Sequence, residues 1–210
     1  MLRVLVKESF ESFLERIAAS TPTPGGGSAS AICGALSAAL SRMVANLAVG
    51  KPGYEHMQAD LSQVDTRGIE LQGRFLALAS EDADAYDAVV AAMRLPKAND
   101  AERAARREAM QSAYQRAAQV PMETIGAALE ALEIAALAAE RGNRSAITDA
   151  GVAALLAEAA MRGAALNVRV NLAAIADEGW RERTERELGL LLEAGTKRAN
   201  AIEALVESRM

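Results

Sequence analysis

The sequence predicts an all-α fold, a single antiparallel bundle of long helices. Alanine accounts for 48 of the 210 residues, whereas aromatic residues make up only 3%. Because alanine has the highest helix propensity and strands favour β-branched and aromatic residues, this composition disfavours a sheet-rich fold. Apolar residues also recur at helical spacing through long segments, and short stretches rich in Gly, Pro or Asn separate these segments.

The first two helices flank the densest cluster of helix-breaking residues in the chain. Apolar residues at spacings of three and four predict a helix over about residues 7–19. It ends before residues 20–27, which read Ser-Thr-Pro-Thr-Pro-Gly-Gly-Gly. Ser28 is the expected cap of a second helix, which reaches about Val49 and ends at the Gly-Lys-Pro-Gly sequence that follows.

The third and fourth helices are expected to be the longest. The third runs from about Tyr54 to Leu95, where Pro96 ends it. The fourth covers about residues 100–141 and should kink at Pro121, because proline lacks an N–H group and its ring crowds the preceding turn. A helix of about 40 residues is near 60 Å long, which exceeds the width of a compact domain of this size. We therefore expect the chain to dimerise and cover the surface that one copy leaves exposed.

The last part of the chain holds two more predicted helices. Ser145 or Thr148 can cap the fifth, which ends near Ala176, and the sixth covers about residues 178–207. The connections between helices are short and polar, or rich in Gly and Pro, and the sequence has no internal repeat or linker. We therefore expect one domain over residues 1–210.

Composition argues against several classes of protein. The net charge of −5 gives no electrostatic basis for a nucleic-acid partner. The single cysteine, Cys33, and the single histidine, His56, argue against a disulfide framework and against a metal site, so no metal is expected. Ser, Arg and Asn interrupt the apolar residues 29–49, which favours a helix of a soluble bundle over a membrane span. Residues 1–7 are too short and too soon charged for a signal peptide, so a cytoplasmic protein is expected.

Gly25, Gly26 and Gly27 lead straight into the second predicted helix and form the first candidate binding element. Backbone N–H groups at such a position can bind an anion or a ligand rich in carbonyl groups. No strand precedes the glycines and the G-x-G-x-x-G spacing is absent, so they are not a dinucleotide site. A flexible hinge is the alternative, but three consecutive glycines are more than a hinge needs.

Carboxylates clustered in the third predicted helix are the second candidate. Asp84 and Asp87 are i,i+3 neighbours, and Asp82 pairs with Tyr86 at i,i+4. Repulsion raises the pKa of one carboxyl in such a cluster, which suits acid–base catalysis, whereas a solvated acidic face is the simpler interpretation. Asp149, at the start of the fifth predicted helix, can likewise merely complement the helix dipole.

Several asparagines lie where a packed helix face is expected. Asn167 and Asn171 are i,i+4 neighbours in an apolar run, and such amides need either backbone partners or a ligand. Asn46, near the end of the second predicted helix, raises the same question. Gly25 and Gly50 lie at opposite ends of that helix, about 37 Å apart. Both can serve one site only if a second subunit packs antiparallel and brings its own helix end alongside.

Five motifs taken together resemble the C-terminal family of formiminotransferase-cyclodeaminases. They are residues 22–28 (PTPGGGS), 43–51 (MVANLAVGK) with Tyr54, 82–87 (DADAYD) with Leu95-Pro96, Val120-Pro121, and 142–151 (GNRSAITDAG) with 165–171 (ALNVRVN). The family contains the cyclodeaminase domain of a bifunctional folate enzyme and stand-alone methenyltetrahydrofolate cyclohydrolases, and this chain has the stand-alone length. Members often carry a run of lysines after the glycine, whereas here Pro52 and Gly53 follow Lys51.

The resemblance implies a dimeric enzyme that hydrolyses 5,10-methenyltetrahydrofolate to 10-formyltetrahydrofolate without a cofactor, through carboxylate-assisted addition of water to the methenyl carbon. Asp149 and Asp84 are then the expected catalytic residues, and Lys51 would meet a folate carboxylate. The expected substrate-binding residues are Gly25, Gly26, Gly27, Ser28, Asn46, Lys51, Tyr54, Asp87, Asn143, Asn167 and Asn171. The alternatives are a formiminotetrahydrofolate cyclodeaminase that releases ammonia and a helical dimer without turnover, whether folate-binding or purely structural.

Overall fold

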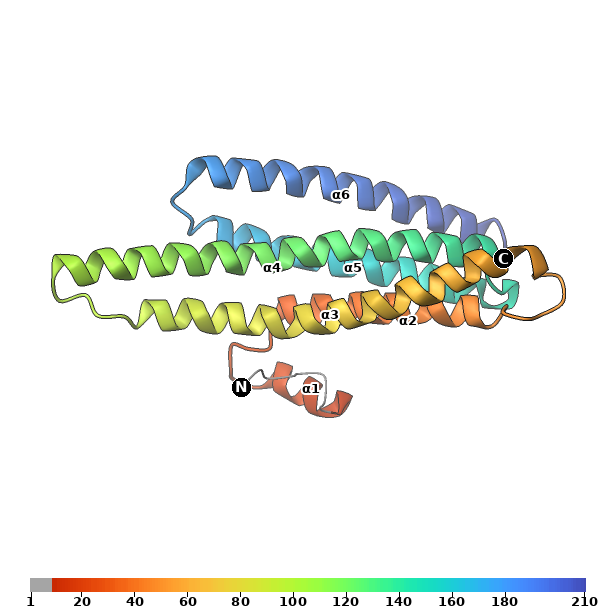
Figure 1. The fold of residues 1–210 in the computed structure, drawn as a ribbon, viewed down its shortest axis with the longest axis horizontal. Helices are drawn as coiled ribbons and strands as arrows, with labels where there is room; N and C mark the ends of the chain where they lie inside the picture. The colour runs from red at the N-terminus through yellow and green to blue at the C-terminus, as the bar shows by residue number, and fades with distance from the viewer. Residues whose placement is uncertain (1–8) are drawn as a thin grey trace.

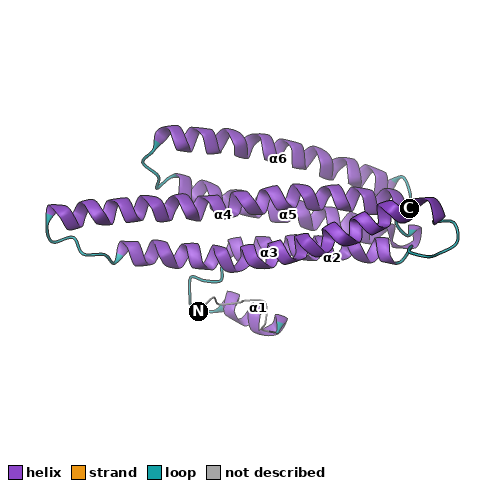
Figure 2. Cartoon of the chain, viewed as in Figure 1, coloured by secondary structure: helices purple, strands orange, loops and turns teal. Residues whose placement is uncertain are grey.

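The computed structural model describes residues 9–210, which are all-α as predicted (Figure 1). Its helices are α1 (Phe10–Ala18), α2 (Gly26–Asn46), α3 (Gln58–Met93), α4 (Asp100–Arg141), α5 (Ile147–Leu172) and α6 (Glu178–Glu207), with single 3-10 turns η2 at Glu55–Met57 and η3 at Arg144–Ala146. Only helices and connecting loops occur in this part of the chain (Figure 2). The predicted start of the first helix, at residues 7 and 8, lies outside the described residues.

The four helices α2, α3, α4 and α5 form an antiparallel bundle. α2 packs between α3 and α5, and α4 packs against the same two helices from the opposite corner. α6 lies along α4 and α5 on the outside of this bundle, and α1 stands apart from it beside α3 (Figure 1). Because α3 and α4 are longer than α2, their hairpin extends well past the first turn of α2 (Figure 1).

Small residues allow the central helices to approach closely. A side chain at Gly34 of α2 would place its Cβ 2.3 Å from the ring of Phe75 on α3. A side chain at Gly163 of α5 would lie equally close to the hydroxyl of Ser30 on α2. Among the described residues, α2 and the segment Arg144–Leu172 are the two stretches long and apolar enough to cross a membrane, and both lie side by side in the bundle.

The bounds of α4 and α6 agree with the prediction, whereas the start of α2 differs. Its N-cap is Gly25, so Ser28 is the third helical residue and does not cap the helix. The start of α5 differs as well, because the side chain of Asn143 caps the preceding 3-10 turn, and neither Ser145 nor Thr148 caps α5. A glycine N-cap has no side chain to accept a hydrogen bond, so the first turn of α2 needs a partner from elsewhere.

α4 continues through Pro121 and stays close to straight in Figure 1, where the sequence predicted a kink. Proline has no N–H group, so the carbonyl four residues earlier, that of Ala117, loses its helical donor. The side chain of Asn171 on α5 supplies a replacement, because its Nδ2 donates to the Ala117 oxygen at 2.9 Å. The second Nδ2 proton goes to the backbone oxygen of Asn167 at 2.8 Å. Both N–H protons of the Asn171 side chain therefore bind the protein's own backbone.

This pairing predicts non-additive stability changes. Asn171→Ala leaves the Ala117 carbonyl without a donor, and we expect a loss of about 1–3 kcal/mol in the free energy of unfolding. Pro121→Ala restores the backbone donor, so the same Asn171 substitution should cost much less in that background. Chemical denaturation of the four proteins measures the coupling, and strictly additive effects would contradict the proposed link.

Candidate active site

The first turn of α2 packs against Asp82 of α3. Gly27 leaves space for this carboxylate, because a Cβ at Gly27 would lie 2.1 Å from Asp82 Oδ1. Ser28 donates its backbone N–H to the carboxylate, and its Oγ lies 3.1 Å from Asp82 Oδ2. Asp82 thus accepts the hydrogen bond that a side chain at the N-cap would accept in other helices. This explains why a glycine suffices at that position.

Burial controls the ionisation of Asp82. Desolvation raises the pKa of its carboxyl, while the hydrogen bonds from Ser28 oppose that rise. The Ser28 hydroxyl has a single proton and lies 2.8 Å from the oxygen of Ala79 as well as near Asp82. A protonated Asp82 can therefore donate to Oγ while Oγ donates to Ala79. A carboxyl whose pKa is raised by burial binds a proton more readily than an exposed carboxyl does, which suits proton transfer.

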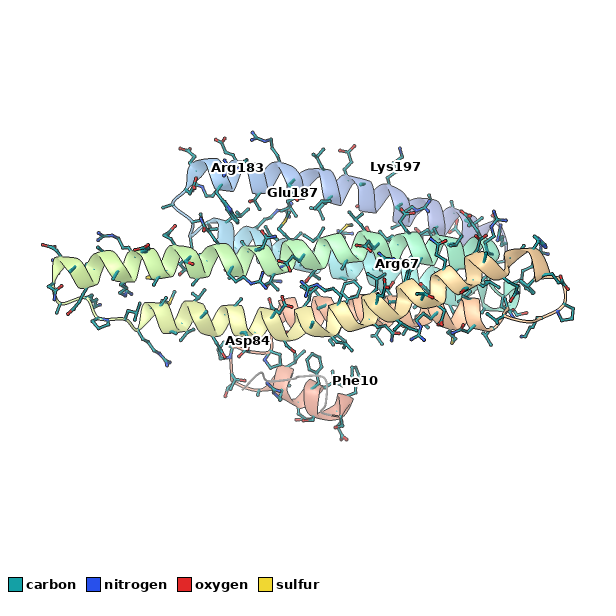
Figure 3. The ribbon with its side chains drawn as sticks, viewed as in Figure 1. Phe10, Arg67, Asp84, Arg183, Glu187 and Lys197 are labelled. Atoms are coloured by element: carbon teal, nitrogen blue, oxygen red, sulfur yellow. The ribbon has the colours of Figure 1, made fainter. Side chains whose placement is uncertain are left out.

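Asp84, which the sequence analysis selected from the same acidic cluster, lies on the outside of α3 (Figure 3). Its side chain is exposed and makes no hydrogen bond or ion pair within residues 9–210. Asp82 was missed as a site residue, although a sequence signal for it exists. It continues the buried stripe of α3 formed by Leu78, Ala85 and Val89, and an acidic residue at such a position requires an explanation.

Three helices converge where α2 begins. Asn167 of α5 lies beside Gly26, since a Cβ at that glycine would be 3.7 Å from Asn167 Nδ2. This Nδ2 donates to the backbone oxygen of Gly163 at 3.0 Å, and its Oδ1 accepts no hydrogen bond among the described residues. The N–H groups of Gly26 and Gly27 likewise have no acceptor in that part of the chain. Free donors, a free amide oxygen and the carboxyl of Asp82 thus lie close together.

A cavity of about 750 Å³ opens next to this point. Its residues come from the end of α1, the connection to α2 and the second half of α3: Arg16, Ala19, Thr21, Pro22, Thr23, Tyr86, Asp87, Val90, Ala91 and Arg94. Tyr86 is one helical turn from Asp82, and Thr23 is two residues before Gly25. Both walls of the cavity therefore lead to the first turn of α2. The sequence-predicted binding residue Asp87 lies within it.

The other predicted residues lie at the opposite end of the bundle. Asn143 joins the end of α2 to the start of α5, because its Nδ2 donates to the Leu47 oxygen at 2.8 Å while its Oδ1 accepts from the N–H of Ser145. The hydroxyl of Tyr54 accepts from the backbone N–H of Arg144 at 3.2 Å. These contacts explain both side chains as structural ties between the connections at this end.

Asp149 and Lys51 share this end. Asp149 is half-buried in the first turn of α5, and Lys51 is exposed in the loop after α2. Lys51 makes no ion pair with any residue of the described chain, so its ammonium group is available to an anion. Asp149 is thus buried to an intermediate extent, as Asp82 is, whereas Lys51 is exposed.

Asn46 binds a carboxylate that the sequence analysis did not identify. Its Nδ2 donates to Oδ1 of Asp65 on α3 at 2.9 Å, and the same oxygen accepts from Nε of Arg42 at 2.8 Å. The hydrogen bond from Asn46, followed by that from Arg42, holds the pKa of Asp65 below its usual value. Arg42 lies over Gly68, where a Cβ would be 2.3 Å from its side chain. This cluster is ordered and ionised, but it lies far from Asp82.

The candidate residues therefore form two groups. One group lies toward the start of α2 and consists of Gly25–Ser28, Asp84, Asp87, Asn167 and Asn171, together with Asp82. The other group lies toward the end of α2 and consists of Asn46, Lys51, Tyr54, Asn143 and Asp149. The 21 residues of α2 separate them by roughly 30 Å. One chain does not bring the predicted catalytic residues Asp84 and Asp149 together.

Several known proteins are similar to this chain in sequence or in fold. The chain is 45% identical to a methenyltetrahydrofolate cyclohydrolase of Methylorubrum extorquens over 90% of this chain and 91% of that protein. It is 30% identical to the formimidoyltransferase-cyclodeaminase of Rattus norvegicus over 98% of this chain, which spans 38% of that longer protein.

A crystal structure with a similar fold is that of a formiminotetrahydrofolate cyclodeaminase from Thermotoga maritima. It matches with a TM-score of 0.87 and 28% sequence identity, over 96% of this chain and 97% of that one. The family model described as formiminotransferase-cyclodeaminase matches residues 9–189. Because this match covers most of the sequence, the chain belongs to the formiminotransferase-cyclodeaminase family.

Proposed function

We propose that this protein hydrolyses 5,10-methenyltetrahydrofolate to 10-formyltetrahydrofolate. The observation that carries the proposal is the 45% identity, over nearly all of both chains, to a protein named for that reaction. The similarity to cyclodeaminases is lower, at 28–30% identity. The single thiol, Cys33, and the absence of any second cysteine are compatible with the cytoplasmic location expected from the sequence.

The reaction removes both protons from the attacking water and supplies one proton to N5. A base takes a proton from water, and the oxygen bonds to the cationic methenyl carbon between N5 and N10. The tetrahedral intermediate then loses its hydroxyl proton and forms a carbonyl, while the C–N5 bond breaks and its electron pair returns to N5. N5 takes up a proton, so one proton is released per turnover. Carboxylic acids can perform both transfers.

We assign the proton transfers to Asp82 in preference to Asp84. Asp82 is half-buried, has a raised pKa and is hydrogen-bonded by Ser28, whereas Asp84 is exposed and makes no side-chain contact of this kind within the described chain. The free N–H groups of Gly26 and Gly27 are placed to stabilise the oxygen that becomes negatively charged in the intermediate. The Oδ1 of Asn167 can accept from an N–H group of the substrate.

Asp149 is proposed as the second carboxylate of the site, contributed by another subunit. α2 supports such a homodimer, because one side of it is an apolar stripe that this chain leaves exposed or only half-buried: Ile32, Leu36, Leu40, Met43 and Leu47. Leu166 and Val170 of the adjacent α5 are 66% and 68% exposed. A symmetric pair of antiparallel α2 helices buries this stripe. It also brings the end of one α2 to the start of the other.

Charge favours the same arrangement. Asp84 and Asp87 are exposed near the start of α2, whereas Lys51 is exposed beyond its end. Antiparallel pairing places the lysine of one copy near the two carboxylates of the other. The groups that one chain keeps roughly 30 Å apart then form a single site at each end of the interface.

The test is turnover of 5,10-methenyltetrahydrofolate by the purified protein, followed by loss of the near-ultraviolet absorbance of the methenyl group. We expect decay well above the uncatalysed rate. If this rate is unchanged but formiminotetrahydrofolate yields ammonia, the protein is a cyclodeaminase. If neither substrate reacts, the proposal of an enzyme is wrong, and folate binding without turnover becomes the function to measure.

A further inference from the structure

The cavity between α1 and α3 has no role in the proton transfers described above. Its volume of about 750 Å³ is in the range of pockets that bind small molecules, and its walls carry aromatic, apolar and charged side chains. We propose that this cavity binds the aminobenzoyl-glutamate arm of the substrate, with Arg94 binding a carboxylate of the glutamate. The inference rests on the proposed function and assigns it a specificity-determining residue.

The direction of the cavity fits such an arm. Tyr86 forms its near part, one helical turn along α3 from Asp82, and Arg94 lies two turns further on. The rise along α3 from Asp82 to Arg94 is about 18 Å. A folate whose reacting carbon is beside Asp82 has its pterin ring on one side of that carbon and the extended arm on the other. The arm can therefore follow α3 and end near Arg94.

The wall chemistry changes along the cavity in the order that this arm requires. The ring of Tyr86 and the side chains of Val90 and Ala91 offer the apolar surface that suits a benzoyl ring. At the far end, the guanidinium of Arg94 has a planar set of donors that matches a carboxylate. The side chain of Arg94 is exposed and forms no ion pair or hydrogen bond with the other described residues. Its charge is therefore not neutralised by a neighbouring carboxylate.

The same cavity contains one acidic group and the hydroxyl groups of two threonines. Asp87 lies one residue beyond Tyr86, where it can accept from the amide N–H that joins the benzoyl and glutamate parts. Thr21 and Thr23 line the opposite wall, on the connection from α1 to α2. The hydroxyl of Thr21 donates to the backbone oxygen of Thr23 at 3.2 Å, which helps to hold this connection over α3.

The sequence analysis expected Lys51, not Arg94, to bind a folate carboxylate. Lys51 lies beyond the end of α2, roughly 30 Å from the glycines, so it reaches the same substrate only from a second subunit. Arg94 lies at the end of α3, the same helix of the same chain that carries Asp82. The assignment of the glutamate carboxylate to Arg94 and its assignment to Lys51 therefore predict that different substitutions weaken binding of the glutamate.

The test compares two substrates that differ only in the glutamate, 5,10-methenyltetrahydrofolate and 5,10-methenyltetrahydropteroate. For Arg94→Gln we expect a rise in KM of about tenfold or more with the glutamate-containing substrate, because a charge-assisted hydrogen bond is lost. The KM for the pteroate and both kcat values should stay within about twofold. Arg107→Gln is the matched control, because Arg107 is an exposed arginine of α4 outside the cavity.

Three results would overturn the inference. One is an equal change in KM for both substrates in Arg94→Gln, another is no change for either, and the third is a glutamate-dependent loss confined to Lys51→Gln. Equilibrium binding of 5-formyltetrahydrofolate, measured by calorimetry, separates this inference from the proposed reaction. Binding that weakens in Arg94→Gln supports the subsite even if the wild-type protein turns over neither substrate.

Discussion

Asp82→Asn is expected to reduce kcat for methenyltetrahydrofolate hydrolysis by about 10²–10⁴-fold, the usual contribution of a positioned acid–base group. Asparagine has nearly the same shape as aspartate, and its oxygen can still accept the backbone N–H of Ser28. It cannot take up a proton from water. The loss should therefore fall on kcat, with a smaller effect on KM.

The same substitution is not expected to destabilise the protein at neutral pH. Burial raises the pKa of Asp82 in the folded state, so the folded chain holds this proton more tightly than the unfolded chain does. The stability that this group contributes is full below its pKa in the unfolded chain, and it is lost as pH rises through the folded pKa. The Asp82→Asn variant has no carboxyl here to ionise, so it does not lose stability in this way as pH rises. The Tm of the variant should therefore equal or exceed that of the wild type at neutral pH, and this advantage should disappear in acid.

Two further variants test Asp82 by different means. Gly27→Ala would place a Cβ 2.1 Å from the carboxylate and displace it, so activity should fall even though Asp82 is present. Gly73→Ala on α3 is the matched control, because a Cβ there would meet no atom within 4 Å and Gly73 has no part in the site. Asp84→Asn removes an exposed carboxylate from the same helix. If that variant loses activity and Asp82→Asn keeps it, the assignment from sequence was right and the one from structure is wrong.

The sequence predicted most of the fold because the features that define it are local. Alanine content, apolar spacing and Gly or Pro punctuation correctly predicted six helices in the described residues, including the bounds of α4 and α6. The predicted start of α2 was wrong because the hydrogen-bond partner of its first turn is Asp82, which lies 54 residues after Ser28. Spacing along one helix carries no information about such a contact.

Pro121 shows the same limit. Its sequence position predicted a kink, but the carbonyl that it leaves free is bonded by Asn171 from another helix. The amide pair Asn167 and Asn171 was correctly identified as needing partners, and the two possible kinds of partner were backbone groups and a ligand. The structure supplies backbone partners for both side chains, since Nδ2 of Asn171 donates to two backbone oxygens and Nδ2 of Asn167 donates to one. Asn167 also lies beside Gly26 at the start of α2.

Mixing two inactive variants is expected to restore activity if the site is shared between subunits. Asp82→Asn and Asp149→Asn should each abolish most turnover as homodimers, because each site then lacks one carboxylate. In a heterodimer, one site lacks both carboxylates and the other lacks neither. With random pairing of equal amounts, half of the dimers are mixed, so activity should recover to roughly a quarter of the wild-type value.

A control pair has both defects in the same half of the site. Asp82→Asn mixed with Gly27→Ala should stay inactive, because every site in the heterodimer still contains one damaged α2–α3 contact. Subunits are exchanged by unfolding and refolding the mixture, and turnover is compared with that of each variant treated alone. Absence of recovery in the first pair, with wild-type activity regained after the same treatment, would show that Asp82 and Asp149 do not share a site.

The position of the interface can be tested without activity. Leu36 is at the midpoint of α2, is 45% exposed and belongs to the apolar stripe. In a symmetric antiparallel pair, this residue faces its own copy across the two-fold axis, so Leu36→Cys in a Cys33→Ser background should form a disulfide-linked dimer on mild oxidation. Leu190→Cys on α6, 69% exposed and outside the stripe, should stay monomeric on a denaturing gel. If Leu36→Cys cross-links efficiently but mixed Asp82→Asn and Asp149→Asn variants recover no activity, the proposed dimer is correct and each reaction site lies within one chain.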